Sequence, residues 1–168
     1  MSRAFVKEQD GNFPDDDIAE LPQTDEPNYV TPSGLAQLRA KHHALQEQHG
    51  ALAAKAEDDP VQKPALRALE RDLNFVTGRI ERALLVEPAA QPADEVRFGA
   101  EVTVEDEKGK PFRFFIVGQD ETDIAHGKVS WASPLARAMM GAKVGDVVDW
   151  QRPAGASRLE VTAIRYPS

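Results

Sequence analysis

The chain has 168 residues and carries 20 Lys and Arg against 28 Asp and Glu, which gives a formal net charge of −8. This length accommodates one or two small domains and excludes a large multidomain enzyme. The absence of cysteine excludes disulfide scaffolds, thiolate metal sites and cysteine nucleophiles. No apolar run approaches the roughly 18 residues of a membrane span, and the first residues do not read as a secretory signal, so we expect a cytoplasmic protein without a membrane segment.

Residues 1–28 hold most of the excess negative charge. They contain two basic and eight acidic residues, and Pro14, Pro22 and Pro27 interrupt any periodic pattern. This composition predicts an acidic, flexible N-terminal tail. The rest of the chain is close to neutral and offers no basic surface, which argues against autonomous DNA binding.

Residues 29–88 are predicted to form an antiparallel coiled-coil hairpin of two helices. Thr31 and Pro32 supply a helix cap and a first helical residue. The first arm carries leucines at heptad positions: Leu35, Leu38, Leu45 and Leu52. Pro60 and Pro64 then interrupt the helix. The second arm carries a regular heptad seam: Leu66, Leu69, Leu73, Val76, Ile80 and Ala83.

Arms of about 24 residues each would make a rod roughly 35 Å long, with its tip near residues 57–63. His42 and His49 lie on the first arm and raise the question of a metal site. Seven residues separate them by about 10.5 Å along a helix, which is too far for both to bind one zinc ion. We therefore expect them to be residues of the helix seam.

Residues 89–95 are predicted to be a linker, and residues 96–168 a small sheet domain. Alternating and β-branched segments predict antiparallel strands over residues 101–105, 111–117, 129–131, 147–151 and 159–165. Gly109 and Gly155 mark turns between strands. Ser133 and Pro134 are typical of the start of a helix, here a short one over residues 135–140. The fold class is therefore α+β.

Four segments together resemble the Gre family of transcription elongation factors. FGAEVTVEDEKGKPFRFFIVG (Phe98 to Gly118), SPLARAMMGAKVGD (Ser133 to Asp146) and RPAGASRLEVTAIRY (Arg152 to Tyr166) are similar to the family's C-terminal domain. YVTPSGLAQL (Tyr29 to Leu38) resembles the start of its N-terminal coiled coil. The segments follow in the family order, and the PAGA turn and FRFFIVG strand look more like the GreB branch than the GreA branch.

The resemblance implies a coiled-coil hairpin joined to an FKBP-like domain, with bacterial RNA polymerase as the partner. In the family, the coiled coil enters the secondary channel of the polymerase. Acidic residues at its tip help to hold a second catalytic magnesium ion in the polymerase active centre. The polymerase itself then hydrolyses the 3′ end of backtracked RNA. Such a protein is an accessory factor rather than an enzyme, has no cofactor of its own, and contacts nascent RNA and DNA only within the elongation complex.

The acidic triplet Glu57, Asp58 and Asp59 is the candidate for that tip, with Asp58 and Asp59 as the expected magnesium ligands. Carboxylate oxygens suit a weakly held magnesium ion. The family's Asn-Ala-Glu-Tyr tip motif is absent, and each arm looks shorter than in a typical member by about two turns. An alternative role for Asp59 is to cap a second helix that begins at Pro60, with Gln62 as its capping partner.

Ser133 and Pro134 match part of the acidic-Ser-Pro element through which the family docks on the polymerase. The acidic residue is replaced by Ala132. Both residues also favour the start of a helix. The sequence therefore allows a structural role, a docking role or both for this pair.

Three functions compete at this level. The first is stimulation of RNA cleavage by the polymerase, through the acidic tip. The second is regulation or inhibition by a rod that occupies the channel without cleavage. The third is a coiled-coil adaptor unrelated to transcription, for which a dimer held by the seam is expected, whereas the channel-binding hypotheses predict a monomer. Prolyl isomerase activity is not expected, because most aromatic residues fit strand interiors.

Overall fold

A computed structural model describes residues 25–167, so most of the predicted acidic tail, residues 1–24, lies outside the described residues. The described part divides into two compact units. The helical unit contains Arg39–Glu81, and the sheet unit contains Glu26–Leu38 together with Arg82–Ser168. None of the described helices is long and apolar enough to cross a lipid bilayer.

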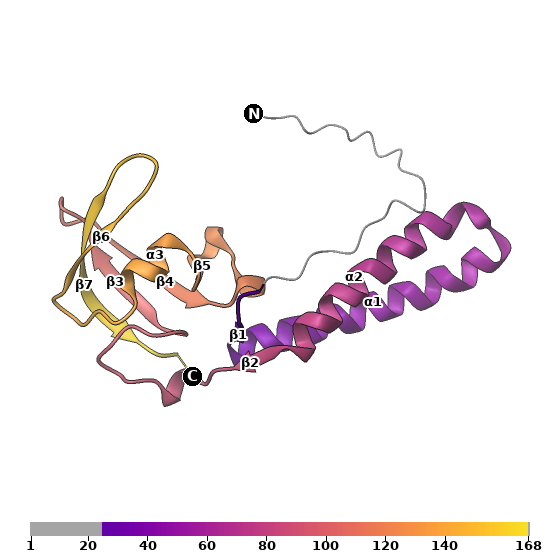
Figure 1. Ribbon diagram of the computed structural model, residues 1–168, viewed down its shortest axis with the longest axis horizontal. Helices are drawn as coiled ribbons and strands as arrows, with labels where there is room; N and C mark the ends of the chain where they lie inside the picture. The colour runs from indigo at the N-terminus through magenta and orange to yellow at the C-terminus, as the bar shows by residue number, and fades with distance from the viewer. Residues whose placement is uncertain (1–24, 168) are drawn as a thin grey trace. The chain divides into compact units, whose positions relative to one another are not determined.

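Two helices lie side by side in the helical unit (Figure 1). Helix α1 spans Pro32–Asp58 and begins at the predicted proline, and helix α2 spans Lys63–Glu81. A short 3-10 turn, η3, joins them over Pro60–Gln62. Because the 3-10 turn intervenes, Pro64 falls in the first turn of α2, where its missing N–H has no intrahelical partner to lose. The predicted helical hairpin is confirmed.

The side chains of the two histidines of α1 contact polar side chains of α2 across the helix seam. His42 Nε2 lies 3.1 Å from Thr77 Oγ1, and His49 Nε2 lies 3.0 Å from Glu70 Oε2. Val76 of α2 is buried, as are Leu45 and Ala56 of α1. The interpretation of His42 and His49 as seam residues is therefore confirmed.

The second helix ends earlier than the heptad pattern predicts. Ala83, the last predicted seam residue, begins strand β2, Ala83–Leu85, which pairs in parallel with strand β1, Asn28–Val30. The Val86 amide extends this pairing by donating a hydrogen bond to the Val30 carbonyl at 2.9 Å. Pairing with a partner distant in sequence thus overrides the continued heptad spacing.

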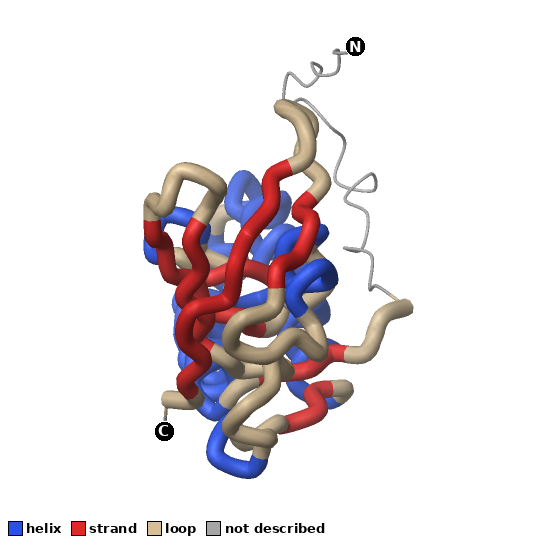
Figure 2. The backbone as a smooth tube through the Cα atoms, turned by 90° about the vertical axis from the view of Figure 1, so that its left-hand side faces the viewer, coloured by secondary structure: helices blue, strands red, loops and turns tan. Residues whose placement is uncertain are grey.

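Five strands form the second sheet, in the order β5-β4-β3-β7-β6. Their bounds are Glu101–Glu105 for β3, Pro111–Val117 for β4, Lys128–Ser130 for β5, Val147–Trp150 for β6 and Ser157–Arg165 for β7. Figure 2 shows these strands in red. Strands β3 and β4 have the predicted bounds, and the other three differ from them by one or two residues.

One pairing corrects the prediction of an antiparallel sheet. β5 runs parallel to β4, with Phe115 opposite Lys128 and Val117 opposite Ser130. The connection between them forms two 3-10 turns, η5 at Gln119–Glu121 and η6 at Ile124–His126, instead of a hairpin. This longer connection returns the chain toward the end of the sheet from which β4 started, so β5 runs in the same direction as β4. The sheet therefore contains both parallel and antiparallel pairs.

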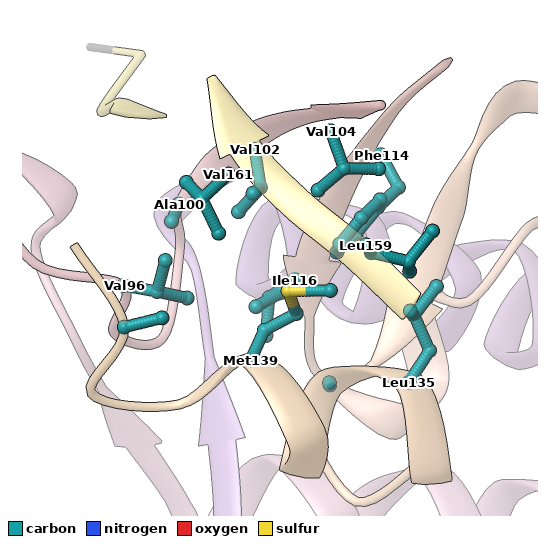
Figure 3. Close-up of a cluster of buried hydrophobic side chains, with 12 residues drawn as sticks. Val96, Ala100, Val102, Val104, Phe114, Ile116, Leu135, Met139, Leu159 and Val161 are labelled. Carbon is teal, nitrogen blue, oxygen red and sulfur yellow. The ribbon is translucent and has the colours of Figure 1, made fainter. Parts of the chain in front are cut away.

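The core of the sheet unit lies between the sheet and the short helix α3, Pro134–Met139. Figure 3 shows the apolar side chains of α3 and the sheet converging there. Alternate residues of β4 point into this core, so that Phe114 and Ile116 are buried. The cluster comprises Val96, Ala100, Val102, Val104, Phe114, Ile116, Leu135, Ala136, Met139, Ala142, Leu159 and Val161. Each large side chain of this kind stabilises the fold by about 1.5–3 kcal/mol when buried.

The predicted turn between β3 and β4 is organised by Asp106. Its Oδ1 accepts hydrogen bonds from the amides of Lys108 and Lys110, both at 2.9 Å. The bond from the Lys110 amide is the main cause that lowers the pKa of Asp106. Gly109 adopts a positive φ of 77° in this turn, a conformation that glycine adopts without strain.

The start of α1 is attached to the sheet unit through Thr31. The Thr31 hydroxyl accepts a hydrogen bond from the Gly34 amide at 2.9 Å and donates one to Glu121 Oε1 at 2.6 Å. A Cβ at Gly34 would lie 2.7 Å from the same carboxylate oxygen. A Cβ at Gly118 would lie 2.3 Å from the carbonyl oxygen of Tyr29 in β1. Gly118 is therefore required by the close approach of the β1 backbone, whereas a side chain at Gly34 would have to displace the Glu121 carboxylate.

Replacing Gly118 by Ala should destabilise the protein, because the new methyl group would displace the backbone of β1. Overpacking of this kind costs about 1–3 kcal/mol in free energy of unfolding. Gly50→Ala is the matched control, since Gly50 lies within α1 with no atom within 4 Å of a Cβ placed there. Alanine at that helix position should stabilise by about 0.5–1 kcal/mol. Denaturant unfolding followed by circular dichroism measures both, and equal stability of Gly118→Ala and the wild type would contradict the packing described here.

Candidate functional site

The acidic triplet lies at the tip of the helical unit. Glu57 and Asp58 are the last two residues of α1, and Asp59 precedes the 3-10 turn that leads into α2. All three side chains are exposed. The fold therefore places three consecutive carboxylates where the chain reverses direction.

Asp59 is occupied by structural hydrogen bonds. Its Oδ1 accepts from the Val61 amide at 3.1 Å, and its Oδ2 accepts from Gln62 Nε2 at 3.2 Å. It is the N-cap of η3, with Pro60 next in the chain. Asp59 therefore caps a turn that begins at Pro60, as considered from the sequence, but this turn is the 3-10 helix η3, and α2 begins only at Lys63. Gln62 bonds to the Asp59 side chain and not to its backbone N–H, which donates to the Lys55 carbonyl.

Glu57 and Asp58 differ from Asp59 in this respect. Among residues 25–167, no hydrogen bond or ion pair engages either side-chain carboxylate. Their oxygens are hard, negatively charged ligands of the kind that magnesium prefers. Of the three predicted tip residues, these two are free to bind a cation or a basic group without breaking an existing contact.

The tip does not form a complete metal site within this chain. In the described part of the chain, no group of three or more His, Asp or Glu side chains is arranged to hold a metal ion. Adjacent carboxylates on an exposed tip supply too few ligands for a preorganised site. Binding of a metal here would require additional ligands from another molecule.

The second candidate element, Ser133 and Pro134, begins helix α3. Ser133 Oγ accepts a hydrogen bond from the Ala136 amide at 3.2 Å, and Pro134 occupies the first turn. Ser133 is half-buried, whereas Pro134 is exposed. The predicted helix start is confirmed, and the exposed side of Pro134 leaves room for a second role.

A carboxylate from a distant segment lies beside this element. Arg137 Nε donates to the Ala132 carbonyl at 2.8 Å, and Arg137 Nη2 pairs with Glu26 Oε2 at 2.9 Å. Gln119 Nε2 holds the other oxygen of Glu26 at 2.8 Å. The Glu26 side chain is nevertheless 39% exposed. Sequence reasoning placed Glu26 in the tail, and no local signal indicates its position beside Ala132.

An open aromatic cleft adjoins the same element. Tyr29 lies 5.8 Å from Phe98 and 5.1 Å from Trp131 between ring centroids. These rings, together with Met140 and Arg137, border a cleft of about 550 Å³. Trp131 Nε1 is buried without a hydrogen-bond partner among the described residues. Tyr, Trp and Arg are the residue types most enriched at binding hot spots, so this cleft, Glu26 and Pro134 form a candidate protein-docking surface.

Comparison with known proteins identifies relatives along most of the chain. Residues 91–166 match the family described as "Transcription elongation factor, GreA/GreB, C-term". Transcription elongation factor GreB of Neisseria meningitidis serogroup B is 32% identical over 164 residues, covering 85% of this chain and 96% of that protein. Transcription elongation factor GreA of Rhodospirillum rubrum is 33% identical over 159 residues, covering 82% and 96%.

Among solved structures, GreA factor homolog 1 of Thermus thermophilus aligns with a TM-score of 0.40. It is 21% identical, and the alignment covers 83% of this chain and 99% of that protein.

Proposed function

Because the chain belongs to the GreA/GreB family of transcription elongation factors, we propose that it binds bacterial RNA polymerase through the secondary channel and acts on paused or backtracked complexes. Within the channel, it stimulates the intrinsic RNA cleavage of the polymerase. The observation that carries this proposal is the pair of unengaged carboxylates, Glu57 and Asp58, at the exposed tip of the helical unit.

In this proposal the three tip residues divide two tasks. Asp59 fixes the turn by capping η3 through Oδ1, which accepts from the Val61 amide, and by accepting from the Gln62 side chain through Oδ2. Asp58, and secondarily Glu57, supplies carboxylate oxygens to a magnesium ion of the polymerase active centre. When bound, that ion stabilises the attacking and leaving oxygens in phosphodiester hydrolysis. Asp58 is assigned the main role because it adjoins the capped turn, which limits the motion of its backbone.

The protein acts as an accessory factor and does not cleave RNA alone. The tip offers two free carboxylates, and the remaining magnesium ligands and the RNA 3′ end belong to the elongation complex. Contacts with nascent RNA and DNA accordingly arise only within that complex. The protein works in the cytoplasm, where the polymerase is found, and as a monomer. Sedimentation at micromolar concentration separates this proposal from a coiled-coil adaptor, for which a dimer held by the helix seam is expected.

Docking is assigned to the surface around Ser133 and Pro134. Glu26 replaces in space the carboxylate that the family carries at the position of Ala132, since Arg137 joins Glu26 to the Ala132 carbonyl. The aromatic cleft beside it accepts an apolar side chain of the polymerase. A carboxylate held by Arg137 and Gln119 is preorganised, which reduces the entropy lost on binding.

Asp58→Asn should reduce RNA cleavage in backtracked complexes by about 100-fold, the effect typical of removing one charge-stabilising group from a reaction centre. Asparagine keeps the size of the side chain but loses the charge that binds the cation. Asp59→Asn should have a much smaller effect, because asparagine is also a good helix cap.

The matched control is Glu47→Gln, which removes an exposed carboxylate about 16 Å further down α1. Cleavage rate and polymerase affinity should both stay at the wild-type level for this variant. If Asp58→Asn cleaves RNA as fast as the wild type, the tip mechanism is wrong and a non-cleaving regulator becomes the better description.

Glu26→Gln should weaken binding to the cognate polymerase by about five- to tenfold, a loss on the order of 1 kcal/mol. The variant leaves the tip intact, so cleavage at saturating concentration should stay near the wild-type rate. Glu107→Gln, an exposed carboxylate in the β3–β4 turn, is the control and should bind normally. Unchanged affinity for Glu26→Gln, measured by competition binding, would remove Glu26 from the docking surface.

A further inference from the structure

A pocket of about 300 Å³ lies in the sheet unit, and none of the tip or docking residues lines it. It is bordered by the start of α1, by the 3-10 turn η4 at Pro88–Ala90, by β4 and by the segment from Glu121 to Lys128. Pro32, Pro88, Phe115 and Val117 give it mainly apolar walls. Four separate segments thus enclose a space within the range typical of small-molecule sites.

Glu121 brings a buried carboxylate to this pocket. The residue is only 7% exposed, although it carries a charge. Its Oε1 accepts the hydrogen bond from the Thr31 hydroxyl at 2.6 Å. Its Oε2 forms an ion pair with Lys128 Nζ at 3.8 Å, which is longer than a hydrogen bond. Oε2 is therefore held by an ion pair rather than by a hydrogen bond, and it does not belong to the fully buried, unpartnered side-chain atoms of the described residues.

The second buried glutamate of the sheet unit, Glu101, shows the usual compensation. It is 4% exposed, and Arg165 Nε donates to its Oε1 at 2.8 Å while Arg113 Nε lies 3.1 Å from its Oε2. Both oxygens are thus engaged by arginines. Buried charges normally require such pairing because desolvation is costly. Glu121 has a hydrogen bond from Thr31 and a longer ion pair with Lys128 in place of the two arginines.

Together, Glu121 and Lys128 present one acceptor and one donor side by side in an apolar pocket. The separation of 3.8 Å between Oε2 and Nζ leaves both groups able to bond to the same small polar group. A primary amide matches this pair, since its N–H donates and its carbonyl accepts from neighbouring atoms. An ammonium or a carboxylate would meet one attractive and one repulsive charge here, and would lose its hydration in a mainly apolar pocket without full compensation.

We propose that this pocket binds a small molecule with an apolar body and a primary carboxamide. The amide N–H donates to Glu121 Oε2, its carbonyl accepts from Lys128 Nζ, and the body packs against Phe115, Val117 and Pro88. At about 30 Å³ per water-sized group, the pocket holds roughly ten non-hydrogen atoms. The site uses none of the tip or docking residues, so it goes beyond the proposed action on polymerase and stands independently of it.

The test is an NMR titration of the full-length, ¹⁵N-labelled protein with 3-phenylpropanamide. We expect saturable shifts at Thr31, Glu121 and Lys128 with a millimolar dissociation constant. The matched probes 3-phenylpropionate and 3-phenylpropylamine have the same body but carry a charge. Both should bind at least tenfold more weakly. Equal binding of either charged probe would overturn the assignment of the ligand class.

Two variants locate the binding site. Ala89→Phe should fill the mouth of the pocket and reduce binding at least tenfold, whereas Ala90→Phe, on the same exposed turn but not lining the pocket, should leave it unchanged. Lys128→Met removes the donor and keeps the apolar stem, so it should weaken binding at least fivefold; Lys143→Met is its exposed control. Absence of saturable shifts in the wild type, or shifts that persist in both pocket variants, would overturn the proposal.

Discussion

In the sheet unit, the position of the start of α1 against the segment that follows β4 depends on the two hydrogen bonds of the Thr31 hydroxyl. The hydroxyl group caps the first turn of α1 through the Gly34 amide and donates to the buried Glu121 carboxylate. The carboxylate in turn lies at the positive end of the helix, where negative charge is favourable. Close packing at Gly34 and Gly118 brings β1 and the start of α1 against the segment that follows β4. In the same unit, β1, which precedes α1, pairs in parallel with β2, which follows α2.

Local sequence patterns predicted the elements that depend on the alternation or capping preferences of neighbouring residues. The alternation in Glu101–Glu105 and Pro111–Val117 fixed both strands, and Ser133 with Pro134 located the start of α3. Pairings between distant segments were not predictable in this way. The parallel pairs β1–β2 and β4–β5 form because the fold brings their backbones together, and a strand of three residues is too short to show a period of two.

The candidate sites show the same limit. The acidic triplet and its possible capping role were visible in the sequence, because capping depends on neighbours within a few residues. The sequence did not show that Asp59 is engaged while Glu57 and Asp58 are free. This difference follows from the hydrogen bonds of Asp59 in the structure. The position of Glu26 beside Arg137 could not be predicted from the sequence, because the two residues are 111 positions apart and only the folded chain brings them together. Glu121 and Thr31 are likewise 90 positions apart.

In the proposed function, the capped turn positions the free carboxylates that bind the cation. Asp59 restricts the turn, so the neighbouring Asp58 presents its oxygens from a defined backbone. The most direct measurement is RNA cleavage in a stalled, backtracked elongation complex of the cognate polymerase, with saturating wild-type protein and binding verified by co-sedimentation. The account predicts faster shortening of the RNA 3′ end than with polymerase alone. A fully bound complex whose RNA is not shortened would contradict it.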